Sequence, residues 1–328
     1  MNKLWFFLVF LLACSNPKHK VIVHNIGFAQ GTTYSIKYSV DPGIDFQFSI
    51  DSIFAQIDSS LSTYVPFSSI SKINQHKLKQ INDPHFLAVF ERSQQISKQT
   101  NGAFDATINP LIDLWGFGGV DTLNVDSLMV KKQLKNCGFS QVYMQDSLLV
   151  MPPSFSLNFN AIAQGYTVDV LAQFLEQKNI SNYLIEVGGE LRASGTNGDR
   201  GWWKIGIDKP QEKPDPSDRF QVVITLQNKA LATSGNYRNF YIKDEQIFSH
   251  TIDPISGFPV QHNLLSATVL AGDCMSADAY ATAFMIMGLD STIAFLQSHP
   301  ELEAFLIYGE NQQWKNWSTN GFDQLIVD

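Results

Sequence analysis

Two short stretches of the chain combine residue types and spacings that could do chemistry. In Asn158–Tyr166, an apolar strand leads through small residues into an expected helix, which leaves backbone groups free to meet a ligand. In Ser276–Thr282, Asp278 and Thr282 stand four residues apart on an expected helix, so both side chains project from one face. A carboxylate and a hydroxyl are the oxygen ligands that suit Mg²⁺, whose shell is completed by substrate phosphates and water. If the two stretches converge, they form a metal-dependent site for a phosphate-bearing ligand.

Each of these candidates also has a purely structural interpretation. Asp278 could be an acid favoured by the dipole at a helix start, and Thr282 could bond back onto its own helix. His250 follows an expected short strand pair and could act as a general base at neutral pH, although a lone histidine is more often structural. The other histidines receive that structural interpretation: His19, His24, His76, His85, His262 and His299. No phosphate-binding loop with Lys, Gly-x-Ser-x-Gly elbow or His-Glu-x-x-His pair occurs in the sequence.

The N-terminus has the pattern of a secretory signal. A charged start is followed by the uncharged run 4–13, which is too short to span a bilayer. Leu11-Leu12-Ala13-Cys14 looks like a bacterial lipobox, in which Cys14 becomes the lipidated first residue; an ordinary signal peptide with an incidental cysteine is the alternative. We therefore expect a signal peptide over 1–13, a lipidated cysteine and polar tether over 14–20, and a protein anchored to a membrane without spanning it.

Composition limits the classes of function. The 328-residue chain has a net charge of −8, so an exported acidic domain of this kind lacks the basic surface that nucleic-acid binding requires. The length after residue 20 suffices for a large core in one or two domains. Cys137 and Cys274 remain in that part; an exported compartment permits a disulfide between them, and two buried thiols are the alternative.

The elements that must position these residues follow no regular βαβ alternation. Residues 21–40 predict a strand pair around Gln30-Gly31-Thr32, and further strands are expected at 183–187, 203–208 and 221–226. Helices are expected over 45–61, from Asp83-Pro84 to Asn101-Gly102, over 165–178, from a Ser276 cap to Gly288, and over 291–297. This order favours an α+β fold over a doubly wound sheet.

Six of these segments, in this order, resemble the ApbE family of FAD:protein FMN transferases, which are often exported lipoproteins. The resemblance extends from Gln30-Gly31-Thr32 to the Asp278 helix. It implies a domain over 21–328 with mixed or antiparallel sheets and packed helices, in a T-fold-like architecture. It also implies a reaction in which the FMN half of FAD is transferred to a Thr or Ser hydroxyl of a target flavoprotein and AMP is released.

The resemblance assigns roles to matching positions of this sequence. Asp278, Thr282 and the backbone carbonyl of Ala161 match Mg²⁺ ligands, and His250 resembles the catalytic histidine. The positions that match flavin-binding residues are Tyr64, at the end of the first helix, the triplet Ala103, Phe104 and Asp105, and Thr251 or Ile252.

Three positions within the expected flavin site depart from the family pattern. Gln30 stands where Met is frequent, Asn158 where many members carry Asp, and Gln164 where many carry Lys. The last two changes each remove one charge, of opposite sign, and both amides still form hydrogen bonds. We therefore expect FAD binding to survive.

Two other functions use the same residues. With water as the acceptor, the site would be an FAD pyrophosphatase that yields FMN and AMP. A non-catalytic FAD-binding lipoprotein is the second alternative, and His250, Asp278 and Thr282 argue against it because storage needs no base. For the transferase, the expected partners are FAD, Mg²⁺ and an exported flavoprotein acceptor, such as a subunit of a membrane redox pump. The expected location is the periplasmic side of a bacterial membrane.

Overall fold

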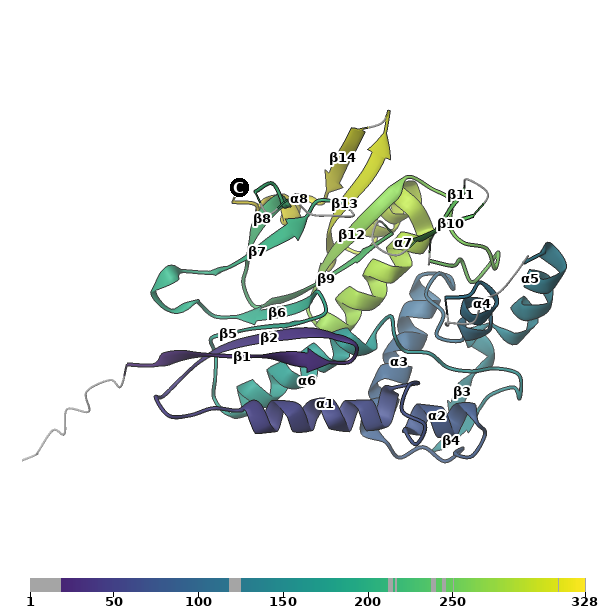
Figure 1. Ribbon diagram of the computed structural model, residues 1–328, viewed down its shortest axis with the longest axis horizontal. Coiled ribbons are helices and arrows are strands. Elements are labelled where there is room, and N and C mark those ends of the chain that lie inside the picture. The colour runs from purple at the N-terminus through teal and green to yellow at the C-terminus, as the bar shows by residue number, and fades with distance from the viewer. Residues whose placement is uncertain are drawn as a thin grey trace, which may run out of the picture.

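An eight-stranded antiparallel sheet organises the computed structural model, which describes residues 19–117, 125–211, 215, 217–236, 240–243, 246–249, 251–311 and 313–327 (Figure 1). In spatial order its strands are β1 (Val21–Ala29), β2 (Thr32–Val40), β5 (Tyr183–Val187), β6 (Glu190–Ser194), β9 (Lys229–Gly235), β12 (Leu264–Ala271), β13 (Glu303–Glu310) and β14 (Gln313–Ser318). Each neighbouring pair of these strands is antiparallel.

The central strands are covered on both faces, which explains their sequences. Along β12, Val269 belongs to the large core on the helical side, whereas its neighbour Leu270 belongs to the core on the opposite side. On β13, Leu306 and Phe305 divide in the same way. Because successive side chains of a strand point to opposite faces, a strand buried on both faces needs a nearly continuous apolar run.

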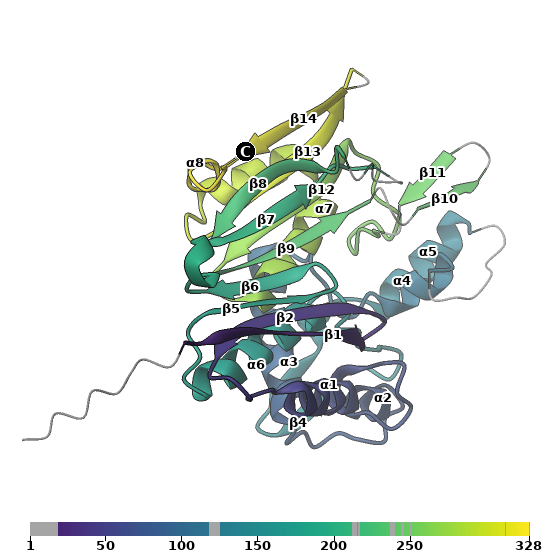
Figure 2. The same cartoon turned by 60° about the vertical axis from the view of Figure 1, so that its left-hand side comes forward.

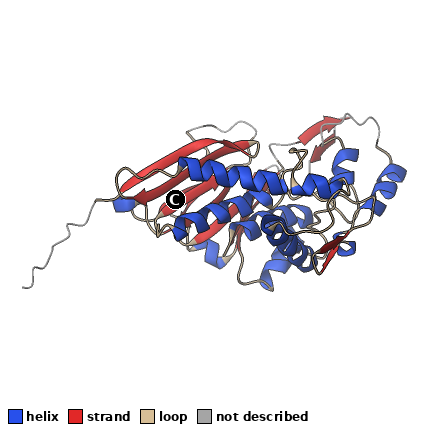
Figure 3. Cartoon of the chain, turned by 90° about the horizontal axis from the view of Figure 1, so that it is seen from below, coloured by secondary structure: helices blue, strands red, loops and turns tan. Residues whose placement is uncertain are grey.

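Helices cover one face of the sheet in two layers. Helices α6 (Ala163–Gln177) and α7 (Cys274–Gln297) pack directly on the strands, and α1 (Gln47–Leu61) and α3 (Pro84–Gln99) pack on these helices. Seen from below, the helices gather alongside the strands of the large sheet (Figure 3).

Helix α7 has the length and apolarity of a membrane span, but half of its most apolar window is buried inside the protein. It is interrupted at Gly288, whose φ of 74° is not helical. The chain continues in helical form after this break, up to Gln297.

A small second layer covers the other face of the sheet. The antiparallel pair β7 (Trp203–Asp208) and β8 (Phe220–Leu226) and the short α8 (Asn320–Asp323) enclose a separate apolar cluster there.

Two further hairpins in the described residues are β3–β4 (Tyr143–Gln145, Leu148–Val150) and β10–β11 (Phe240–Lys243, Gln246–Ser249). The remaining helices are α2 (Ser69–Asn74), α4 (Asn109–Leu114), α5 (Ser127–Gln133) and three 3₁₀ turns at Leu134–Asn136, Phe139–Gln141 and Gly198–Arg200. Hairpin β10–β11 lies at the same end of the molecule as α4 and α5 in both ribbon views (Figures 1 and 2).

Most of the expected elements are confirmed, and so is the α+β class. Hairpin β1–β2 turns at Gln30 and Gly31, which both have positive φ, as a tight hairpin turn requires. Asp83 caps α3 by accepting from the amides of His85 and Phe86.

One capping prediction is wrong. Asp273, and not Ser276, caps α7: its carboxylate accepts from the Ser276 amide, 2.7 Å away, and from the Ser276 hydroxyl. The local sequence offers an acid and a hydroxyl three residues apart, and the acid takes the cap because it accepts from both donors. Of the two alternatives for the cysteines, the buried thiols hold, because Cys137 and Cys274 are both free and buried.

Candidate active site

The first turn of α6 lies directly against α7, and Gly165 makes this possible. A Cβ at this position would lie 2.4 Å from the Cys274 carbonyl oxygen and 2.8 Å from Asp278 Cβ. The Gly165 amide donates to Asp278 Oδ2 across 3.1 Å. A helix extending back to Ala161 would direct this amide to the Ala161 carbonyl, so the interaction with Asp278 leaves that carbonyl available to a ligand.

Asp278 is a buried carboxylate at this junction. Burial raises its pKa to about 7, and the hydrogen bond from the Gly165 amide opposes the rise. One turn further along α7, the half-buried Thr282 hydroxyl lies 3.3 Å from the Ser234 hydroxyl of β9. Three of the predicted site residues, Ala161, Asp278 and Thr282, are therefore brought to the start of α6 and the adjoining face of α7.

Asp169 of α6 attaches the N-terminus of α7. Its Oδ1 accepts from the Cys274 amide at 3.0 Å, and its Oδ2 accepts from the Met275 amide at 2.8 Å. Arg192 of β6 donates to Oδ1 at 2.7 Å and completes the arrangement. Free amides at a helix start accept a carboxylate well, so Asp169 holds the helix that carries Asp278 against the helix that follows Ala161.

Glu190 is a second buried carboxylate at the same place. The residue is 7% exposed, and its Oε2 has no hydrogen-bond partner in the part of the chain that the structure describes. Burial raises its pKa well above the usual range, and the neighbouring charge of Asp278 raises it further. The residue begins β6, immediately after the turn Gly188-Gly189.

These groups fit a magnesium ion. They offer a main-chain carbonyl, a hydroxyl and carboxylate oxygens, which are hard donors, and Mg²⁺ binds to proteins through one or two carboxylates and otherwise keeps water or substrate phosphate. Among the described residues, the site therefore has more carboxylate oxygens than hydrogen-bond donors, since Glu190 Oε2 has no partner. Within the described residues, no cluster of three or more His, Cys, Asp or Glu side chains is placed to hold a metal.

The β1–β2 turn reaches the same end of α6. Gln30 Nε2 donates to Thr167 Oγ1 at 2.9 Å, and Gln164 Nε2 donates to the Gln30 carbonyl at 3.4 Å. Burial raises the pKa of Asp58 on α1, which also accepts a hydrogen bond from Gln30. Gln30 and Gln164, two of the positions that depart from the family pattern, are thus in contact beside the predicted cation site.

Asn158 connects two loops that precede the site. Its amide nitrogen Nδ2 donates to Asn109 Oδ1 at 3.0 Å, and its Oδ1 accepts from the Asn160 amide at 2.8 Å. Its backbone amide donates to the Ala106 carbonyl. Asn158 therefore orders the chain that leads to Ala161.

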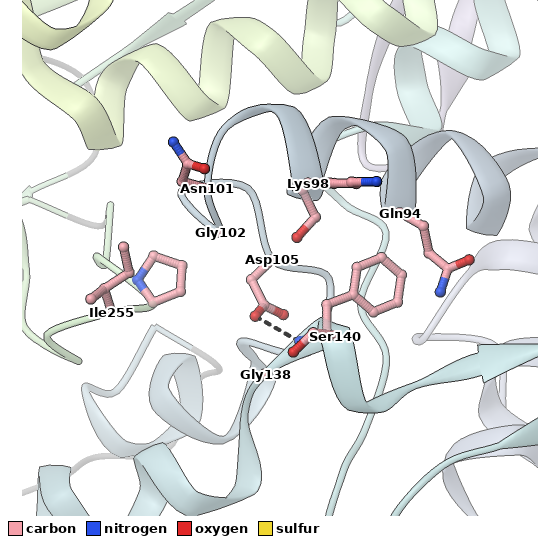
Figure 4. Close-up of a pocket in the computed structure, with 11 residues that line it drawn as sticks. Gln94, Lys98, Asn101, Gly102, Asp105, Gly138, Ser140 and Ile255 are labelled. Atoms are coloured by element: carbon pink, nitrogen blue, oxygen red, sulfur yellow. Dashed lines mark hydrogen bonds between the residues drawn. The ribbon is translucent and has the colours of Figure 1, made fainter.

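The triplet at 103–105 lies mostly inside the protein. Ala103 and Phe104 are buried, and the Asp105 carboxylate accepts from the Thr107 amide and hydroxyl and from the Phe139 amide at 3.0 Å. Burial raises the pKa of Asp105, against these hydrogen bonds. Figure 4 shows Asp105 in a cavity of about 550 Å³, together with Lys98, Asn101 and Ile255, and its hydrogen bond within that wall. Ala161, Asp278 and Thr282 do not line this cavity.

The other expected flavin contacts differ in exposure. Tyr64, in the loop after α1, is 82% exposed, so its ring is free to contact a ligand. Thr251 donates to Asn236 Oδ1 at 2.7 Å, and Ile252 is buried and forms a bridge with Pro259. His250 and Cys14 lie outside the described residues.

Sequence reasoning did not identify Gly165, Asp169 or Glu190 as parts of the site. Gly165 lies at an expected helix start, but its role depends on Asp278, which is 113 residues later in the chain. Glu190 had one usable signal, since an acid directly after a glycine pair on a buried strand is unusual. Asp169 had none, because its partners are backbone amides.

The antiparallel sheet with its packed helices defines an α+β protein with a cluster of oxygen donors at the start of α6, and comparison with known proteins gives the family. The sequence matches the ApbE family over residues 30–306, and the chain belongs to that family. It is 33% identical to the FAD:protein FMN transferase of Vibrio cholerae, over 97% of this chain and 96% of the relative. Its identity to the enzyme of the same name from Escherichia coli K12 is 30%, over 97% and 95% of the two chains.

Solved structures agree with this assignment. The flavin transferase ApbE from Vibrio cholerae superimposes with a TM-score of 0.81 at 31% identity, covering 93% of this chain and 99% of the other. The apo form of the Pseudomonas stutzeri flavinyl transferase ApbE gives a TM-score of 0.83 at 29% identity, over 93% and 97%.

The close approach of α6 to α7 makes Gly165→Ala a test of the junction. The added methyl group would meet the Cys274 carbonyl at 2.4 Å, so the two helices must separate. We expect a loss of about 1–3 kcal/mol in the free energy of unfolding, measured by urea denaturation. Gly272→Ala is the matched control, because nothing lies within 4 Å of its Cβ position. Equal stability of the two variants would contradict the close packing.

Proposed function

We propose that this protein transfers the FMN half of FAD to a Thr or Ser hydroxyl of a target flavoprotein and releases AMP. The observation that carries the proposal is the convergence of Asp278, Thr282 and the Ala161 carbonyl at the first turn of α6. This site occurs in a chain whose relatives, matched over nearly their whole length, are FAD:protein FMN transferases.

The reaction exchanges one phosphorus–oxygen bond for another. The acceptor hydroxyl oxygen attacks the phosphorus on the FMN side of the diphosphate, and the bond from that phosphorus to the bridging oxygen breaks. AMP leaves with the bridging oxygen, and the hydroxyl proton passes to a base. His250 is the proposed base, because an imidazole is suited to accept a proton near neutral pH.

Asp278, Thr282 and the Ala161 carbonyl are the proposed Mg²⁺ ligands. These residues would hold Mg²⁺, which would supply charge neutralisation at the diphosphate oxygens and at the leaving phosphate. The Gly165 amide orients Asp278, and Asp169 holds α7 in register with α6, so the donors are in place before the substrate arrives.

Flavin binding is assigned to the surrounding segments. Exposed Tyr64 offers a ring for stacking on the isoalloxazine. Gln30, Gln164 and Asn158 offer amide groups near the diphosphate, and Ala103, Phe104, Asp105, Thr251 and Ile252 form the supporting walls.

In-gel flavin fluorescence tests the proposal. The purified protein is mixed with FAD, MgCl₂ and a candidate acceptor flavoprotein, and the denatured acceptor band is examined under ultraviolet light. We expect a fluorescent band that disappears when EDTA replaces MgCl₂ and returns when excess MgCl₂ is restored. A dark acceptor accompanied by free FMN and AMP would instead identify a pyrophosphatase.

An exported location is also part of the proposal. The apolar run before Cys14 supports cleavage ahead of this residue and attachment of lipid to it, which places the acceptor among exported flavoproteins. We expect Cys14→Ser to lose incorporation of radiolabelled palmitate and to leave the membrane fraction. Unchanged labelling of the variant would rule out Cys14 as the anchor.

A further inference from the structure

Glu190 has no role in the reaction described so far, although its position is costly. A carboxylate that is 93% buried loses most of its hydration, and one of its two oxygens has no hydrogen-bond donor among the described residues. Buried charges are normally paired with an opposite charge or coordinate a metal. Something other than the neighbouring protein groups therefore stabilises Glu190 in the working protein.

Two close approaches place Glu190 at the same helix turn as Asp278. A Cβ at Gly188 would lie 3.1 Å from Glu190 Oε2 and 3.3 Å from the side-chain nitrogen of Gln164. The residue after Gln164 is Gly165, whose amide bonds to Asp278. The two carboxylates thus converge on the first turn of α6 from β6 and from α7, and they interact electrostatically.

The cationic groups nearby are already used elsewhere. Arg192, on the same strand as Glu190, is paired with Asp169 and Glu176. Gln164 carries no charge, and the Gly165 amide in the first turn of α6 is already engaged by Asp278. Two buried carboxylates therefore face one helix start, and its described donors satisfy only part of their oxygens.

We propose that Glu190 and Asp278 together form a two-carboxylate centre for a divalent cation, in which Glu190 supplies the second negative charge. This inference rests on the proposed function, because it concerns the same cation. Glu190 raises the affinity of the site for the cation before FAD is bound, whereas Asp278, Thr282 and the Ala161 carbonyl fix its position.

A Mn²⁺ titration followed by electron paramagnetic resonance tests this role without any measurement of activity. The purified full-length protein is freed of metal with EDTA, desalted and titrated with MnCl₂ in the absence of FAD. We expect one bound Mn²⁺ in the wild-type protein and a dissociation constant at least about tenfold higher in Glu190→Gln, which keeps the shape and removes the charge. Glu91→Gln is the control, since it removes the same charge from an exposed position on α3. We expect this control to stay within about twofold of wild type.

Thermal unfolding gives a second readout, in which Glu190→Gln is not expected to lose stability although it loses affinity for the metal. Without metal, Glu190→Gln removes the cost of burying this carboxylate, so we expect its melting temperature to be at least equal to that of the wild type. Gln164→Lys places an ammonium group beside Glu190, and we expect it to raise the metal-free melting temperature and to weaken Mn²⁺ binding as well. A merely structural role for Glu190 predicts the reverse, namely a metal-free Glu190→Gln protein that is less stable than wild type.

The outcomes separate this proposal from the proposed function. If Glu190→Gln binds Mn²⁺ as tightly as the wild type, or if the wild type binds none, the two-carboxylate centre is overturned. Glu190-dependent Mn²⁺ binding in a wild-type protein that labels no acceptor would support the centre and would count against flavin transfer. EDTA-sensitive labelling together with unchanged Mn²⁺ binding by Glu190→Gln would support flavin transfer and would overturn the two-carboxylate centre.

Discussion

Asp278→Asn lowers the rate of flavin transfer by at least about 10³-fold, because a metal ion contributes several kcal/mol to the transition state and each 1.36 kcal/mol is a factor of ten. The amide keeps an oxygen that can accept from Gly165, so the junction of α6 and α7 is retained. The charge that is proposed to hold the cation against the diphosphate is lost. Initial rates of acceptor labelling at saturating FAD, with Mg²⁺ varied, measure the effect.

The control for this variant is Asp290→Asn. Asp290 is an exposed acid on the same helix, beyond the break at Gly288. We expect it to label the acceptor at the wild-type rate. If Asp278→Asn keeps more than about a tenth of the wild-type rate, Asp278 is not a ligand on which the reaction depends.

His250→Ala leaves FAD bound and reduces transfer by about 10²–10⁴-fold, the usual contribution of a general base. The change removes the proposed proton acceptor and leaves the cation site intact. Fluorescence titration of FAD and the rate of acceptor labelling, measured on the same preparation, separate binding from chemistry. His24→Ala serves as the control, because His24 is an exposed residue of β1 that bonds only to Ser35 among the described groups.

A His250→Ala protein that labels the acceptor at the wild-type rate would reject this role. A protein that neither binds FAD nor labels the acceptor would place His250 in binding instead of proton transfer. The pH dependence of the wild-type rate offers a further check, since a histidine base must be neutral to accept the proton. The rate should therefore rise with pH through the pKa of that histidine.

Local patterns in the sequence predicted the parts of the site that depend on nearby residues. Asp278 and Thr282 are four residues apart and share a face of α7, as the helical period requires. The glycine pair before Glu190 marked the end of β5, and Gln30-Gly31 marked the first hairpin. Each of these features depends on contacts within a few residues of the chain.

The parts that local patterns could not predict depend on contacts between distant segments. The Gly165 amide meets a carboxylate 113 residues later in the chain, and Asp169 meets amides 105 and 106 residues later. The hydrophobic periodicity of a sequence predicts helices and strands, but it does not predict which helix starts will face each other. The Asp273 cap of α7 was missed for a different reason, since Asp273 and Ser276 are both good capping residues and only geometry separates them.

The fold explains why these distant contacts converge. Both α6 and α7 pack on the same face of one sheet, and Glu190 starts β6, a strand that contacts both helices. The sheet therefore fixes the spacing of the two helices, and glycine at 165 allows them to approach until a backbone amide and a carboxylate bond directly. The Gln30 turn borders this point through its contacts with Gln164 and Thr167.

Intact mass spectrometry of the acceptor, combined with quantification of AMP, tests the central claim most directly. The acceptor is incubated with FAD, MgCl₂ and this protein, then denatured to remove noncovalent flavin. We predict a mass increase equal to one FMN less one water, and one AMP released for each FMN attached. Replacement of the acceptor Thr or Ser by Ala should abolish this mass increase. An unmodified acceptor with AMP and free FMN in equal amounts would contradict the account.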